Sequence, residues 1–221
     1  MKVVHFESGR TIALFKLEEF TPARGINEKA LSDLIAERYR FSRRPDFSQP
    51  RTVLESQTAF ETGEFQSGNT QYSLHKLEIH RDGIVVDAST TEISEGFADD
   101  LIGWLKREKE FRETAITKLF LNQMVVDFQK PLSRLFKGFD AISNIMQRCL
   151  SEDGRPSESI VFVRFDAEPG PREGLRYPNS PRFVIERRVG TEVGQERYYC
   201  SAPLRTDTHL AALEAIEHLV D

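Results

Sequence analysis

Side chains that could perform acid–base or metal chemistry are scattered along this sequence. His75 and His80 lie on one expected strand, but their separation of five residues directs them to opposite faces of a sheet. His209 and His218 lie nine residues apart on an expected helix, about two and a half turns, so they also diverge. We therefore predict no metal site formed by either pair, and no bound cofactor.

A group of acidic residues around one expected helix is the next candidate for cation binding. Asp99 and Asp100 are consecutive on that helix and point about 100° apart, so they do not converge on one ion. Acidic side chains are also favoured near a helix N-terminus by the helix dipole. We interpret the group as solvated acids of the first turns. Its members are Asp87, Glu92, Glu95, Asp99 and Asp100.

No sequence motif with a known catalytic spacing occurs in the chain. There is no GxSxG, no phosphate-binding glycine loop, no GxGxxG and no HExxH. The dipeptide Pro45-Asp46 could open a metal-nuclease pattern, but no Asp-x-Lys or Glu-x-Lys completes it. A metal-dependent hydrolase or nuclease with a site assembled from distant segments stays open as an alternative, because active sites form in space.

A basic segment between Arg38 and Arg51 alternates arginines with aromatic residues. This mixture suits phosphate contact and base stacking, so nucleic-acid binding is one hypothesis. The alternative is a cation-rich helix end followed by a loop whose Phe41 and Phe47 fold back on the core. We favour that alternative, because the positive charge of the segment is modest and local in a chain whose net charge is −5. The candidate anion- or partner-binding residues are Arg40, Arg43, Arg44 and Arg51.

A second candidate binding segment is the connection from Glu168 to Arg182, which is dense in proline and glycine. Loops this long are usually functional or mobile. An anion- or partner-binding loop and a disordered hairpin tip are both compatible with its composition. The candidate residues are Arg172, Arg176, Tyr177 and Arg182.

The composition indicates a soluble, packed protein. Hydrophobic residues make up 39% of the chain and charged residues 29%, enough for a core and for solubility. Cys149 and Cys200 form no CxxC motif, and we expect buried thiols in a reducing compartment. No apolar run has the length of a signal or membrane-spanning segment, so we predict a cytoplasmic protein with no membrane partner.

Helical periodicity predicts four helices. Asn27 is the expected N-cap of the first, which carries an apolar stripe formed by Leu31, Leu34, Ile35 and Tyr39. The others are expected from about Ser94 to Phe111 with Phe97, Leu101, Trp104 and Leu105 inside, from Pro131 toward Cys149 with Leu132 and Ile142 inside, and from Thr206 or Asp207 with Leu213 and Val220 inside.

Strand-like runs lie between these helices. They are Thr11 to Phe20, Val53 to Phe65, Gln71 to His80, Ile84 to Glu92, Ala115 to Phe128, Ser159 to Asp166, Phe183 to Arg188 and Arg197 to Ala202. The turn signals Ser67-Gly68-Asn69 and Arg81-Asp82-Gly83 predict an antiparallel meander.

Together these elements predict an α+β fold with predominantly antiparallel sheets and about four helices packed on one side. The order strand, helix, three strands, helix recurs after about residue 113. It suggests a pseudo-repeat with α+β units 1–112 and 113–221, packed as one globular body, and coincidence is the alternative.

The functional prediction is a non-catalytic macromolecular interaction or assembly protein. It follows from the missing catalytic motifs and from two segments suited to recognition. Another protein or a second copy of the chain is the expected partner, and nucleic acid is not favoured.

Overall fold

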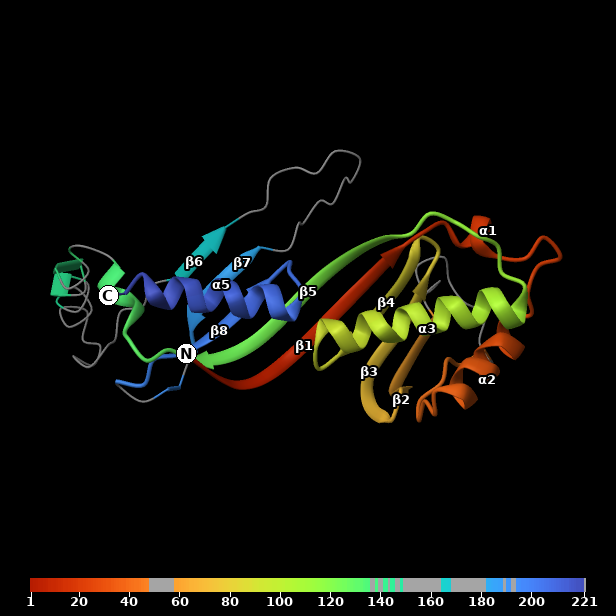
Figure 1. The fold of residues 1–221 in the computed structure, drawn as a ribbon, viewed down its shortest axis with the longest axis horizontal. Helices are drawn as coiled ribbons and strands as arrows, with labels where there is room; N and C mark the ends of the chain where they lie inside the picture. Colours follow the sequence, from red (N-terminus) through yellow and green to blue (C-terminus); the bar gives the residue numbers. More distant parts are fainter. Residues whose placement is uncertain are drawn as a thin grey trace. The chain divides into compact units, whose positions relative to one another are not determined.

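The computed structural model describes residues 1–47, 58–135, 138, 141–142, 144–145, 148, 164–167, 182–188, 190–191 and 194–220. Its elements appear in Figure 1. They are β1 (Lys2–Leu14), α1 (Leu17–Phe20), α2 (Glu28–Arg38), β2 (Thr58–Ser67), β3 (Thr70–His80), β4 (Gly83–Ala88), α3 (Thr91–Lys109), β5 (Thr117–Asp127), the 3-10 helix η2 (Leu132–Leu135), β6 (Arg164–Ala167), β7 (Phe183–Arg187), β8 (Arg197–Ala202) and α5 (Thr206–His218).

The strands form an antiparallel sheet in the order β2-β3-β4-β1-β5-β8-β7-β6. The predicted meander is confirmed, because β2 pairs with β3 and β3 with β4 across tight turns. Gly83 opens β4 with a φ of +141°, and a Cβ there would lie 2.0 Å from the carbonyl oxygen of Ala13. The Asp-Gly turn therefore requires its glycine both for backbone conformation and for the close approach of β1.

The element order matches the predicted repeat. The first series is β1, helices, β2 to β4 and α3, and the second is β5, the η2 turn, β6 to β8 and α5. From one edge of the sheet inward, the strands are β2, β3, β4 and β1. From the other edge inward they are β6, β7, β8 and β5, so corresponding strands of the two series occupy equivalent positions.

The chain divides into two compact units. Unit 1 comprises Met1–Glu7, Gln123–Pro203 and Asp207–Asp221, and unit 2 comprises Ser8–Asn122 and Leu204–Thr206. Strands β1 and β5 each contribute residues to both units. Whether residues 1–112 and 113–221 are domains stays a prediction.

In unit 2, helix α3 packs against β1, β4 and β5, and α2 lies on the same side of the sheet (Figure 1). The predicted inner face of α3 is confirmed, since Phe97, Leu101, Trp104 and Leu105 are all buried. The helix begins at Thr91, three residues before the predicted start. Because these apolar residues recur every three or four positions, they form one face of α3, and this face packs on the sheet.

Helix α2 begins as predicted, because the Asn27 side chain accepts a hydrogen bond from the backbone N–H of Ala30 at 3.0 Å. Its predicted apolar stripe is partly wrong. Leu34 is 40% exposed, whereas Ser32 is only 4% exposed. Ser32 lies three residues before the fully buried Ile35 and so shares its face, while Leu34 is turned about 100° away.

Two further element predictions are wrong in their bounds. The first strand begins at Lys2 and ends at Leu14, and Leu17–Phe20, predicted as strand, is helical. The pairing of β1 with β4 runs from Gly9 to Leu14 and ends there, so the chain leaves the sheet after Leu14. The helix predicted from Pro131 starts as the 3-10 turn η2, and Ile142 of its stripe is 55% exposed.

Unit 1 has its own core, which includes Met124, Leu132, Ile185 and Leu213. Cys200 is fully buried, and burial raises the pKa of its thiol to about 12, as expected for an unreactive interior cysteine. Cys149 and the predicted strand residues 159–163 lie outside the described residues. No helix in the described part of the chain is long and apolar enough to span a membrane.

Candidate functional site

The arginines predicted to bind anions on unit 2 are paired with carboxylates of the same unit. The pairs are Arg40 with Glu64 at 2.9 Å, Arg43 with Glu61 at 2.8 Å and Arg44 with Asp33 at 3.8 Å. Arg51 lies outside the described residues. All of these ion pairs are exposed and individually weak, but a phosphate would compete with a carboxylate at each one.

Two aromatic residues of this segment, Tyr39 and Phe41, are not available for base stacking. Tyr39 and Phe41 are both 3% exposed. The Tyr39 ring lies 4.7 Å from that of Phe97, and the Phe41 ring lies 5.2 Å from that of Phe60. The Tyr39 hydroxyl donates to Asp100 at 2.7 Å, and burial, followed by this bond, raises the pKa of the tyrosine. The geometry favours the alternative for Phe41, which belongs to the core, whereas Phe47 is only half-buried.

A polar hollow of about 420 Å³ lies beside this segment. Its charged lining residues are already matched, because Arg38 pairs with Asp100 at 3.3 Å and Arg40 pairs with Glu64. The hollow therefore offers no uncompensated charge among the described residues to attract an ionic substrate.

The second predicted binding segment contributes only Arg182 to the described structure. Arg182 is exposed and directly precedes β7 in unit 1. Arg172, Arg176 and Tyr177 lie outside the described residues. The use of this loop in recognition stays a prediction.

The acidic residues considered as cation ligands are each engaged by a cationic or hydroxyl group of the protein. Asp87 receives two hydrogen bonds from Arg10, at 2.6 and 2.9 Å, while Asp99 lies 2.7 Å from Lys118. Asp100 binds Tyr39 instead. Within the described ranges, no group of three or more potential metal ligands comes together. The predicted divergence of Asp99 and Asp100 is confirmed.

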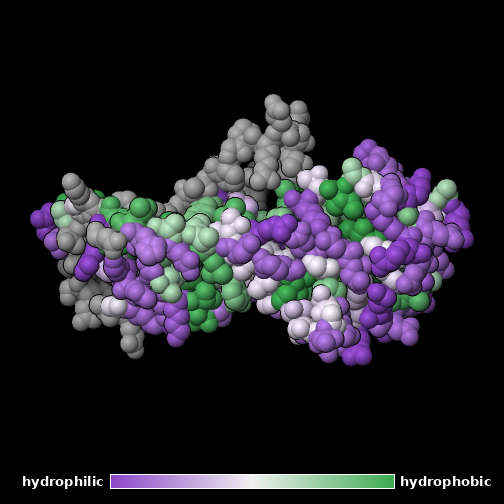
Figure 2. Space-filling view, viewed as in Figure 1, coloured by the Kyte–Doolittle hydropathy of each residue, from purple (hydrophilic) through white to green (hydrophobic). Residues whose placement is uncertain are grey.

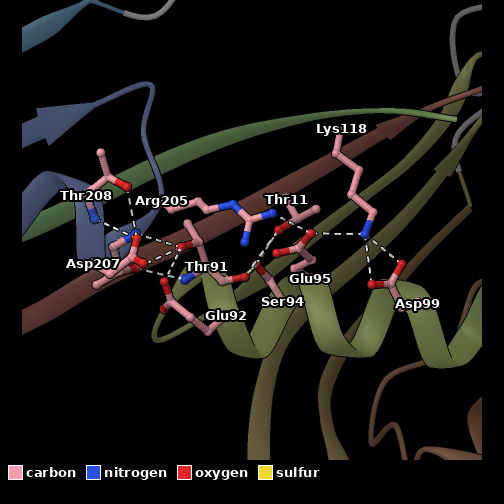
Figure 3. Close-up of polar contacts among 11 residues, drawn as sticks. Thr11, Thr91, Glu92, Ser94, Glu95, Asp99, Lys118, Arg205, Asp207 and Thr208 are labelled. Atoms are coloured by element: carbon pink, nitrogen blue, oxygen red, sulfur yellow. Dashed lines mark hydrogen bonds and ion pairs between the residues drawn. The ribbon is translucent and has the colours of Figure 1, made fainter.

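A buried polar network joins the first residues of α3 and α5 (Figure 3). The backbone N–H of Thr91 donates to the Thr206 hydroxyl at 3.0 Å, and that of Thr206 donates to the Thr91 hydroxyl at 2.7 Å. Asn122 also donates to Thr206 at 3.0 Å, and Thr11 shares a 2.7 Å bond with Ser94. The hydroxyl of each threonine thus accepts a hydrogen bond from the N–H of the other threonine at the start of its helix. We interpret the network as structural, because every hydroxyl in it is engaged.

Charged residues around this network are also compensated (Figure 3). Glu95 lies 3.0 Å from Lys118 and 2.9 Å from Arg205. The Arg205 guanidinium stands 4.6 Å from the centre of the Phe120 ring. These contacts place Lys118, Phe120 and Asn122 on the helix side of β5.

The other side of the central strands in unit 2 carries apolar side chains that no described helix covers. In β1, Thr11 and Ala13 are fully buried on the helix side, so Ile12 and Leu14 point to the opposite side. Val85 of β4 is the register partner of Ile12. In β5, Leu119 and Leu121 alternate with the helix-side residues. We call this set the apolar sheet face; it consists of Ile12, Leu14, Val85, Leu119 and Leu121, all half-buried.

Charges bordering the apolar sheet face cancel locally. Arg10 and Asp87, which are register partners in β1 and β4, form the bidentate pair described above. On β3, Lys76 forms an ion pair with Glu78. The face is therefore apolar at its centre and neutral at its border. By contrast, the side of unit 2 shown in Figure 2 is mostly hydrophilic.

The apolar sheet face was missed in the sequence, although a signal for it exists. The runs Ile12 to Leu14 and Leu119 to Leu121 are apolar on both sides of a strand. Such runs are typical of strands covered on both faces.

No protein-family model, no curated protein and no solved structure matches this chain. Function is therefore inferred from geometry alone.

Proposed function

We propose that this chain is a non-catalytic protein-binding module whose apolar sheet face receives an apolar surface of another protein. One observation carries the proposal. The central strands have apolar side chains on both sides, yet the described helices cover only one side. When a partner covers half-buried aliphatic side chains on a continuous strand surface, their removal from water stabilises the complex.

A polypeptide suits this face better than a nucleic acid does. Its aliphatic centre offers no phosphate contact, and Arg10, the nearest arginine of β1, is engaged by Asp87. Nucleic-acid affinity depends on cations that neutralise phosphates, whereas protein interfaces have apolar centres and polar borders. The net charge of −5 points the same way.

The test is site-specific photo-crosslinking in extracts of cells that produce the protein. A photoreactive residue at Val85 should give one crosslinked product of defined mass. The same residue at Leu34, which is exposed on α2, is the matched control and should not give that product.

A second variant tests whether the crosslinked product forms at the apolar sheet face. Ile12→Lys places a charge beside Val85 and should lower the crosslink yield about tenfold, as expected when a central interface residue is lost. Circular dichroism checks that the variant is folded. Equal crosslinking from Val85 and Leu34, or a yield unaffected by Ile12→Lys in folded protein, would refute the proposal. A product with the mass of two chains would identify a second copy as the occupant in place of another protein.

A further inference from the structure

A cavity of about 350 Å³ lies inside unit 2, between α2, α3 and the strands β2 to β4. Its walls include Phe20, Phe60, Ile35 and Leu101, which are almost fully buried. Close-packed interiors leave few voids larger than a water molecule, and small-molecule sites begin at about 300 Å³. The cavity therefore has the size and the apolar lining of a small ligand site.

Ser32 supplies a polar group inside this cavity. It lies on α2, lines the cavity and is only 4% exposed. Its hydroxyl has no hydrogen-bond partner among the described residues. The hydroxyl is therefore open to donate a hydrogen bond to a polar atom of a bound ligand.

Arg81 supplies a cationic group at the same cavity. It lies in the turn between β3 and β4, where its carbonyl oxygen accepts a 2.9 Å hydrogen bond from the N–H of Leu17. Its side chain is exposed and forms no ion pair within the described part of the chain. By contrast, Arg10 and Arg38 of the same unit each pair with an aspartate. A guanidinium without a partner is suited to a bidentate carboxylate.

We infer that unit 2 binds one small amphipathic monocarboxylate in this cavity. Its apolar part lies against the aromatic and aliphatic walls, its carboxylate pairs with Arg81, and Ser32 is a hydrogen-bond donor within the cavity. Glu28 also lines the cavity and brings one negative charge. That charge repels a second anionic group, so a monocarboxylate is favoured over a dicarboxylate or a phosphate.

The experiment measures displacement of the fluorescent probe 8-anilinonaphthalene-1-sulfonate from the full chain by decanoate and, separately, by decan-1-ol. Both carry the same apolar tail, so their difference reports the carboxylate. We expect decanoate to displace the probe at a concentration about tenfold lower than decan-1-ol does, as expected for a charge-assisted contact.

Variants assign the site. Arg81→Gln should remove the preference for decanoate, whereas Arg107→Gln should keep it. Arg107 is the matched control because it is also exposed in unit 2, has no ion pair among the described residues and does not line the cavity. Ser32→Leu, which removes the hydroxyl and fills space, should weaken both compounds.

Three results would overturn the inference. They are no saturable displacement by either compound, equal displacement by both in the unchanged protein, and a decanoate preference that survives Arg81→Gln. Because Arg81 is exposed, the Arg81→Gln protein should fold. The test is therefore decisive even if the Ser32→Leu protein does not fold. The apolar sheet face is not involved, so failure here leaves the crosslinking proposal standing.

Discussion

The two units share an order of elements but bury different kinds of side chain. In unit 2, Phe20 lies 4.9 Å from Phe15 and 4.9 Å from Phe111, and Phe97 lies 4.7 Å from Tyr39. Among the described residues, the core of unit 1 is mainly aliphatic and contains Met124, Leu132 and Leu213. Its described ring pairs are Phe128 with Tyr198 at 5.4 Å and Phe183 with His209 at 5.5 Å. One arrangement of strands and helices thus accepts different core chemistry, provided that each face stays apolar.

The units also differ in how they treat buried polar groups. In unit 2, Thr91 and Thr206 satisfy each other's backbone N–H groups. In unit 1, His209 is fully buried, and burial lowers the pKa of its imidazole to about 4. The network in unit 2 is therefore uncharged, whereas unit 1 contains a buried imidazole whose protonation destabilises the folded state.

The largest expected effect comes from the aromatic core. Phe97→Ala should lower the free energy of unfolding by about 3–5 kcal/mol, because it removes a ring that contacts several others and leaves a cavity. Urea unfolding followed by Trp104 fluorescence reports on unit 2, where the single tryptophan is buried. Leu213→Ala is the counterpart in unit 1. If Phe97→Ala cost less than about 1 kcal/mol, the contrast between the cores would be wrong.

A second effect, confined to unit 1, depends on pH. The pKa of His209 is near 4 in the folded protein and near 6.5 when unfolded, so the unfolded chain binds the proton first. Stability should be complete above pH 6.5 and should fall by about 3 kcal/mol as the pH decreases to about 4. His209→Leu should remove that part of the pH dependence in denaturant titrations at several pH values.

His75→Gln is the matched control for this titration. His75 is an exposed histidine on β3 in unit 2, so its replacement should leave the pH dependence unchanged. A His209→Leu protein that loses stability between pH 6.5 and 4 as steeply as the unchanged chain would contradict the assignment.

The smallest expected effect concerns the reciprocal threonines. Thr91→Val should cost about 1–3 kcal/mol, because the buried N–H of Thr206 loses its acceptor at 2.7 Å. Thr206→Val should cost a similar amount. A double-mutant cycle from thermal unfolding should show coupling above about 0.5 kcal/mol, since the two residues are in contact. Strict additivity would mean that the bonds do not stabilise the fold.

Features that depend on neighbouring residues could be predicted from the sequence. The Asn27 cap, the inner face of α3 and the turn at Asp82-Gly83 all follow from contacts or spacings within a few residues. They are decided by helical period, capping and φ preference, which act locally.

Features that depend on distant partners could not be predicted. The helical pattern of α2 permitted either Leu34 or Ser32 on its inner face, and only packing against the rest of unit 2 turned the serine inward. Likewise, the sequence suggests Arg43 as a phosphate ligand. In the fold, strand β2 brings the Glu61 carboxylate within 2.8 Å of the Arg43 guanidinium.

By itself, the sequence determined the kind of element at most positions, the antiparallel meander and the repeated element order, because periodicity and turn chemistry are written in adjacent residues. Only the tertiary structure decided which faces are covered, which charges are neutralised and where a cavity remains. Those outcomes depend on pairs such as Thr91 and Thr206, which are 115 residues apart. No local preference specifies a contact at that separation, since it forms only when folding has brought the two distant segments together.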